Sequence, residues 1–216
     1  GTIAIITHIL FGHAQSPEST QPLERLIEIL QVATGAVALV LGIVRAKQET
    51  HIIGNFKQQL AAQAAVFGVI EFIPATRGVT GSVTVTGKSL VNGFQHLVLD
   101  LMANMNVTIV RRSGINLAFT RPGNLIDITL DQPFNAGQTF AVQVVYNGIP
   151  DPIGFGSIDW TKFGSGTTGT MVSTLSEPDG AKTWWPCKDR PDDKATVREW
   201  WTVPSTWTAT GNGKLE

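Results

Sequence analysis

The hydrophobic periodicity of the chain changes near residue 69, and this change limits the possible folds more than any other feature. Before it, apolar residues recur at helical spacing, as in the set Leu23, Leu26, Ile27 and Leu30. After it, apolar and polar residues alternate, which is the pattern of strands that bury one face. The sequence therefore predicts a short helical N-terminal segment followed by a mainly β domain.

Five runs after residue 69 alternate with a period of two, and a sixth does so less cleanly. They cover residues 79–86, 96–101, 107–109, 126–130 and 140–146, followed by residues 197–203. Turn signals rich in Gly and Asn, which supply the positive φ of tight turns, separate the runs: Asn92-Gly93, Ser113-Gly114, residues 122–124, residues 135–137 and Asn147-Gly148. This spacing favours an antiparallel β-sandwich or a curved open sheet.

The first 68 residues indicate a different organisation. An apolar run at residues 3–11 precedes small residues and then the polar residues 16–20, which is the layout of a secretory signal and its cleavage site. We interpret residues 1–15 as a truncated signal segment, which predicts a secreted or periplasmic protein. An ordinary buried strand or helix start is the alternative. Residues 16–68 are expected to form a helical preface.

The charges, the cysteine and the histidines exclude several classes of function. The net charge is -1, from 16 basic and 17 acidic residues, which argues against a nucleic-acid binder. Cys187 is the single cysteine, so the chain has no intrachain disulfide and no structural zinc site built on thiolates. The histidines His8, His13, His51 and His96 do not form His-Glu-x-x-His, and we expect no metal site in this chain.

Residues 175–195 combine paired tryptophans, three prolines and the cysteine between polar turns. Trp184 and Trp185 so close to Cys187 predict a buried thiol in an aromatic core. Such density suits a rigid corner that presents a polar side chain at a domain face. The charged residues favour a local ion-pair network in a turn over a carboxylate cluster: Asp189, Asp192 and Asp193 alternate with Lys188, Arg190 and Lys194.

Residues 176–195 resemble a signature of the aminopeptidase N-like (gluzincin) zinc metallopeptidases. In the bacterial branch of that family it reads roughly Ser-Glu-Pro-x-Gly-Ala-Arg-x-Trp-Trp-Pro-Cys-x-Asp-x-Pro-x-Asp-Lys-Ala, and Lys182 stands here in place of the usual Arg. Further matches are residues 74–77, 79–85, 97–101, 135–137, 154–156, 203–204 and 211–215. The resemblance covers residues 72–216 and indicates the family's non-catalytic N-terminal β domain, which we place at residues 69–216.

The resemblance implies a saddle-shaped antiparallel β domain ahead of a catalytic domain that carries the zinc. It therefore implies no cofactor in this chain, no activity of this chain alone, and two partners: that catalytic domain and the N-terminus of a peptide substrate. At the position of Glu177 the family often has Gln or Glu, which helps to hold the substrate's free α-amino group. A carboxylate on a rigid loop suits that role, and a plain turn carboxylate is the alternative for Glu177.

The chain departs from the family pattern before residue 72. Family members usually have a long first strand there, whereas residues 58–69 predict a helix, with only residues 69–73 left for a strand. The first strand is then short or absent and leaves a sheet edge open. Two other functions remain alternatives: a stand-alone β-sandwich that binds a peptide or glycan through its Trp-rich corner, and a membrane-tethered module anchored by residues 26–44.

Overall fold

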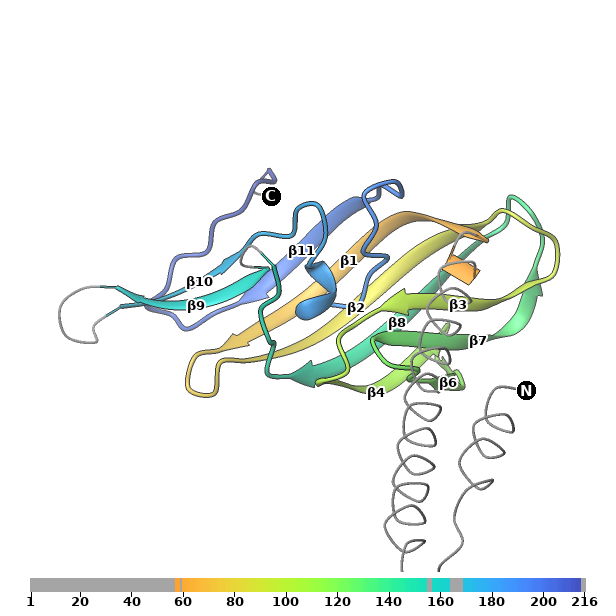
Figure 1. Cartoon of the computed structure of the whole chain (residues 1–216). Helices are drawn as coiled ribbons and strands as arrows, with labels where there is room; N and C mark the ends of the chain where they lie inside the picture. The colour runs from red at the N-terminus through yellow and green to blue at the C-terminus, as the bar shows by residue number, and fades with distance from the viewer. Residues whose placement is uncertain (1–56, 59, 155–156, 164–168, 215–216) are drawn as a thin grey trace, which may run out of the picture. The chain divides into compact units, whose positions relative to one another are not determined.

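The computed structural model describes residues 57–58, 60–154, 157–163 and 169–214 (Figure 1). The chain separates into two compact units, residues 1–51 and 52–216, and the described residues all belong to the second. The signal segment at residues 1–15 lies outside the described residues, as does the helical preface up to residue 56. Both stay predictions.

A six-stranded sheet forms the larger layer of the β domain, in the spatial order β11-β1-β2-β8-β4-β5. The strands are β1 (Ala61–Ile73), β2 (Gly78–Ser89), β4 (Met105–Arg112), β5 (Ile115–Asn116), β8 (Thr139–Gly148) and β11 (Thr196–Thr202). Neighbouring strands are antiparallel except β1 and β11, which pair in parallel. The sheet is therefore mixed, in contrast to the purely antiparallel arrangement expected.

Two smaller sheets complete the domain. A three-stranded sheet lies over the large sheet in Figure 1 and has the order β3-β7-β6, with β3 (Phe94–Asp100), β6 (Phe119–Thr120) and β7 (Leu125–Phe134). An antiparallel pair, β9 (Ile158–Phe163) and β10 (Gly169–Thr174), forms the third sheet. The mainly β class with open sheets is confirmed.

The core between the sheets follows the predicted alternation in most strands. The buried residues of β2, β7 and β8 occupy every second position: Val83, Val85, Ile126, Ile128, Leu130, Val142, Val144 and Tyr146, each at most 1% exposed. In β3 three successive residues, Leu97, Val98 and Leu99, are all buried. Residues 57–58 contact the carboxylates of Asp127 in β7 and Asp100 at the end of β3.

The first strand is the main correction to the sequence prediction. β1 has 13 residues, so the helix predicted over residues 58–69 and the short or absent strand were both wrong, and the domain boundary at residue 69 falls inside this strand. Val66, Ile70 and Phe72 are buried while alternate residues are exposed. The Ala- and Gln-rich run has weak strand propensity, but pairing with both β2 and β11 overrides it. β1 is therefore an interior strand over residues 65–71, where it has a partner on both sides.

Most turn predictions were correct. Gly93, Gly114, Gly123 and Gly137 have φ values of 72°, 84°, 64° and 86°, where a residue with a Cβ is strained. Gly148 does not form a turn, because it is the last residue of β8 and pairs with Met105. A Cβ at this position would lie 2.8 Å from the Met105 sulfur, so close packing accounts for this glycine.

Gly81 provides a test of packing between β2 and β8. A Cβ there would lie 2.7 Å from the ring of Tyr146, which is fully buried. We predict that Gly81→Ala lowers the free energy of unfolding by about 1–3 kcal/mol, because the ring has to move within a packed core. Urea denaturation measures the loss. The control is Thr80→Ala on the half-exposed face, with a change below about 1 kcal/mol. Equal losses for both variants would show that the ring moves freely.

Candidate functional site

Residues 176–195 form a corner that joins the three-stranded sheet to the large sheet. We call these residues the signature corner. Its link to β3 is a backbone pair, in which the N–H of Asp100 donates to the carbonyl of Cys187 at 2.7 Å and the reverse bond measures 3.1 Å. The carboxylate of Asp100 then accepts the N–H of Asp189 at 3.0 Å and the Gln58 amide at 2.7 Å. The end of β3 thus fixes the middle of the corner.

The link to β1 uses both side chains and backbone. The N–H of Lys188 donates to the side-chain oxygen of Gln63 at 3.0 Å, and the N–H of Gln63 donates to the Asp193 carboxylate at 3.1 Å. The ammonium of Lys188 is buried and contacts the carbonyl of Ala61 and the carboxylate of Asp193. The lysine charge is therefore paired, as a buried ammonium requires.

The aromatic residues of the corner lie in the core. Trp184 and Trp185 are stacked with ring centroids 5.1 Å apart and are only 4% and 7% exposed. Phe72 of β1 contacts Trp184 at 6.3 Å between centroids. Cys187 is buried as predicted, and burial raises the pKa of its thiol well above the usual value. The Trp-rich corner therefore has no exposed aromatic platform, which removes the basis for a peptide- or glycan-binding module at this place.

A carboxylate fixes the first half of the corner. Asp189 has a side chain only 5% exposed, and it accepts backbone N–H groups from Gly180 at 2.9 Å and Ala181 at 3.2 Å. These groups begin the short 3-10 helix η2 (Ala181–Thr183). The ammonium of Lys182 completes the environment of Asp189 at 3.1 Å. Hydrogen bonds from several donors to one carboxylate are strong and directional.

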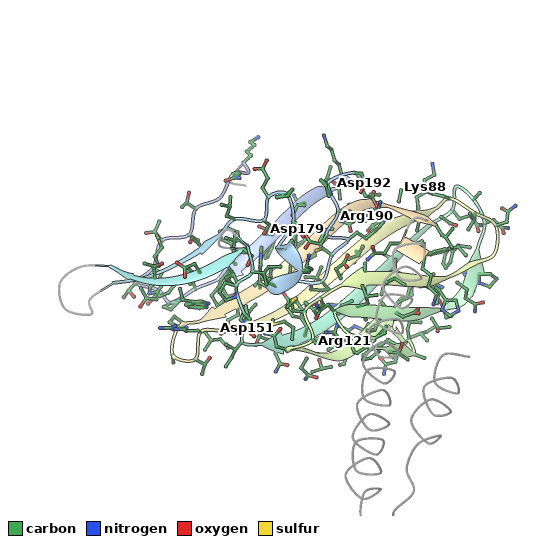
Figure 2. The ribbon with its side chains drawn as sticks, viewed as in Figure 1. Lys88, Arg121, Asp151, Asp179, Arg190 and Asp192 are labelled. Carbon is green, nitrogen blue, oxygen red and sulfur yellow. The ribbon has the colours of Figure 1, made fainter. Side chains whose placement is uncertain are left out.

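The predicted ion-pair network in this turn is confirmed for Asp192 and Asp193, whereas Asp189 pairs with Lys182, outside the predicted set. The ammonium of Lys182 also reaches Asp179 at 3.0 Å, and Arg190 pairs with Asp192 at 2.6 Å. Figure 2 labels Asp179, Arg190 and Asp192 along this part of the fold. The remaining pair is Lys188 with Asp193. The carboxylates at residues 189, 192 and 193 thus each have a basic partner.

Glu177 lies on the exposed part of the corner. Its segment is held on both sides: the N–H of Leu175 donates to the carbonyl of Ser157 at 3.1 Å, and Gly180 is buried with φ at 126°. A Cβ at Gly180 would lie 2.9 Å from Ser157, so the position requires glycine. Lys182 is bound to two aspartates and is not paired with Glu177.

No metal centre is present among the described residues, which contain no group of three His, Cys, Asp or Glu side chains able to hold an ion. His96 is exposed and contacts Asp127 at 3.3 Å, and the other three histidines lie outside the described residues. Within the same residues no helix is long and apolar enough to cross a membrane. The suggested anchor at residues 26–44 lies outside them.

Comparison with known families assigns the domain. The family model of the Peptidase M1 N-terminal domain matches residues 69–216, more than half of the chain. The chain belongs to the M1 peptidase family. A search of curated proteins finds no match.

Solved structures agree with this assignment of an M1 N-terminal domain. An M1 zinc metallopeptidase from Deinococcus radiodurans has 25% identity and a TM-score of 0.62, over 71% of this chain and 35% of that one. Its E323A mutant bound to a Tyr-Ser-Ala substrate has 24% identity and a TM-score of 0.64, over 74% and 36%. Yeast LTA4 hydrolase has 19% identity and a TM-score of 0.55, over 68% and 24%. This chain therefore spans about a third or less of each of these proteins.

Asp100 provides a test of the link between the corner and β3. Burial raises the pKa of its carboxyl above the usual value, although hydrogen bonds from Asp189 and Gln58 oppose the shift. Because the folded-state pKa is the higher one, the contribution of Asp100 to stability is greatest below the unfolded pKa and is lost as pH rises through the folded pKa. Above that range the folded protein holds an ionised, partly desolvated carboxylate.

We therefore predict that wild type loses stability relative to Asp100→Asn as pH rises from about 3 through the acidic range. The asparagine amide keeps an acceptor oxygen for the two donors, the Gln58 amide and the Asp189 N–H, and it carries no charge. Urea denaturation at successive pH values measures the difference between the two proteins. The pKa of Asp131 is lowered by Arg112, which makes its contribution to stability depend on pH as well. That contribution cancels when the two proteins are compared, because both contain Asp131. A constant difference at all pH values would contradict the prediction.

Proposed function

We propose that this M1 N-terminal domain forms one wall of the substrate cleft of a zinc aminopeptidase, which removes N-terminal residues from peptides. Glu177 is the residue that binds the free α-amino group of the substrate. The observation that carries this proposal is an exposed carboxylate on a corner fixed to two sheets. The catalytic domain is the partner that completes the cleft.

The rigidity of the corner supports this role for Glu177. An ammonium that meets a fixed carboxylate gains a charge-assisted hydrogen bond, worth about 1.5–3 kcal/mol. A carboxylate on a mobile loop would lose part of that gain in ordering its segment. Because Trp184 and Trp185 are buried and Asp189 binds the backbone next to the segment, that ordering is completed when the domain folds. Such an anchor selects substrates by position.

Membership of the M1 peptidase family implies that the zinc is held by the catalytic domain. The described residues of this chain contain no group able to hold it. In metallopeptidases the ion polarises the scissile carbonyl and activates water. The contribution of this chain is binding and orientation of the substrate's amino end. We accordingly predict that the 216-residue chain alone binds no stoichiometric zinc and does not hydrolyse an aminoacyl reporter, as measured by metal analysis and fluorescence. One equivalent of zinc with turnover would refute this.

Exposed apolar side chains next to Glu177 support a domain interface here. Met171 of β10 and Leu175 just after it are each 46% exposed. Both lie within six residues of Glu177, and residues 173–179 are all exposed. A second domain covering these residues would remove the two apolar side chains from water and enclose the carboxylate.

A secreted or periplasmic location is a further part of the proposal. Its support is the sequence layout of residues 1–20, an apolar run followed by small and polar residues. Expression of the complete reading frame with a C-terminal tag, followed by fractionation, tests it. Recovery of the tagged protein only from the cytoplasm would contradict this location.

The test of Glu177 uses the complete reading frame that contains this chain. We expect Glu177→Ala to raise KM for a free aminoacyl reporter by about 10- to 100-fold, which corresponds to the loss of one hydrogen bond between charged groups. Glu177→Gln is expected to have a smaller effect, because the amide keeps an acceptor oxygen. Steady-state kinetics measure both.

Asp179→Asn is the matched control, since Asp179 is an exposed carboxylate two residues away. The KM of the Asp179→Asn enzyme should stay within about twofold of wild type, because Asp179 lies on the same segment as Glu177 but has no proposed anchor role. If the Glu177 variants keep the wild-type KM, the anchor role is refuted.

A further inference from the structure

We propose that Asp189 is a positioning residue that sets where the Glu177 carboxylate lies in the substrate cleft. The inference rests on the proposed anchor role of Glu177 and adds a second residue to that site. Asp189 does not reach the substrate, because its side chain is 5% exposed. It acts through the backbone of residues 180–182, directly after the segment that carries Glu177.

The geometry shows how the effect is transmitted. One carboxylate oxygen of Asp189 accepts N–H groups from Gly180 and Ala181, both at 3.2 Å, and the other accepts that of Gly180 at 2.9 Å. These bonds fix the C-terminal side of the exposed segment. On its N-terminal side, Leu175 is bound to Ser157 at 3.1 Å, and the indole N–H of Trp184 donates to the Ser176 hydroxyl at 3.4 Å.

The backbone of Asp189 is itself fixed by a residue of strand β3. Its backbone N–H donates to the carboxylate of Asp100 at 3.0 Å, and Asp100 ends strand β3. Two carboxylates therefore act in series, since Asp100 fixes the backbone of Asp189 and Asp189 fixes the backbone of Gly180. The series connects the rigid sheet to the exposed segment without using a side chain of that segment.

A carboxylate is needed for this arrangement because the groups that contact its two oxygens are all donors. Two backbone N–H groups and the ammonium of Lys182 point at the two oxygens of Asp189. Asparagine would place an NH2 group against some of these donors and would leave the Lys182 charge with only the exposed Asp179. Loss of the charge should therefore loosen the segment while the stacked tryptophans stay in place.

The kinetic consequence is specific. A displaced anchor weakens binding of the substrate's amino group and leaves the chemistry on the other domain unchanged, so KM rises while kcat changes little. For Asp189→Asn we expect a rise in KM of about 5- to 20-fold, smaller than for Glu177→Ala because the anchor is displaced and not removed.

A double-mutant cycle in the complete enzyme tests the coupling. The proteins are wild type, Asp189→Asn, Glu177→Ala and the double variant, with KM and kcat measured on one free aminoacyl reporter. If Asp189 acts through Glu177, its substitution has no further effect once Glu177 is alanine. Asp192→Asn is the matched control, an exposed carboxylate of the same corner that is paired with Arg190 and labelled in Figure 2.

Two further measurements separate positioning from general loss of structure. Near-ultraviolet circular dichroism reports the stacked Trp184 and Trp185 and should be unchanged in Asp189→Asn. Amide hydrogen exchange at Gly180 and Ala181 should be slow in wild type and faster in the variant. Equal exchange at both amides in the two proteins would overturn the proposal, even if the variant is otherwise unstable.

The kinetic outcomes are distinguishable. A rise in KM for each single variant with no added effect in the double variant supports the positioning role. A multiplicative effect in the double variant, or no effect of Asp189→Asn alone, overturns it and leaves the anchor role of Glu177 standing. No effect of Glu177→Ala refutes the anchor role and the positioning role together.

Discussion

The contact between the end of β3 and the signature corner is the constraint on which the rest of the site depends. Asp100 makes both backbone bonds with Cys187 and accepts the N–H of Asp189 with its carboxylate. Burial raises the pKa of Asp100, so ionisation there is opposed by lost solvation. The contact orients the backbone from which Asp189 reaches the start of η2.

The large sheet makes this contact possible by bringing distant segments together. β1 and β11 pair in parallel, from Ala65 with Thr196 to Glu71 with Thr202. A parallel pair needs a long connection, and here that connection includes the small sheets and the signature corner. The corner enters β11 directly, so its last residues are fixed by sheet pairing as well as by contacts with β1. Phe72 packs against tryptophans from the corner, β9 and β11, which joins all three segments to β1.

The sequence allowed prediction of those parts of the fold that depend on local pattern. Alternation in β2, β7 and β8 predicted the buried faces, because each of these strands has one face inward. Glycine in turns predicted four of the connections, since positive φ is a local requirement. The burial of Cys187 and the ion pairs of the turn also followed from neighbouring residues. The parallel pairing of β11 and the length of β1 did not, because partners far along the chain determine them.

Only the exposed part of the candidate site had a signal in the sequence. Glu177 stands out through a family resemblance, and its exposure agrees with a binding role. The residues that position it had no local signal. Asp189 binds backbone nine residues before it, and Asp100 lies 89 residues before Asp189. Sequence reasoning placed Asp189 in an ion-pair network, but its basic partner is Lys182, outside the predicted set. It missed the backbone hydrogen bonds, because an aspartate that binds main-chain N–H groups has the same sequence context as one that binds a lysine.

Lys182 shows why those hydrogen bonds matter more than the ion pair. Its ammonium lies 3.0 Å from Asp179 and 3.1 Å from Asp189, and its side chain is 21% exposed. A lysine contacts a carboxylate as a point charge, whereas an arginine in the family pattern would offer a planar fork that suits bidentate pairing. The change from Arg to Lys therefore reduces the directional part of the ion pair. The backbone N–H groups of Gly180 and Ala181 are independent of this change, so they remain the fixed reference for the Asp189 carboxylate. The position of Glu177 thus depends on main-chain geometry, which a substitution at residue 182 leaves in place.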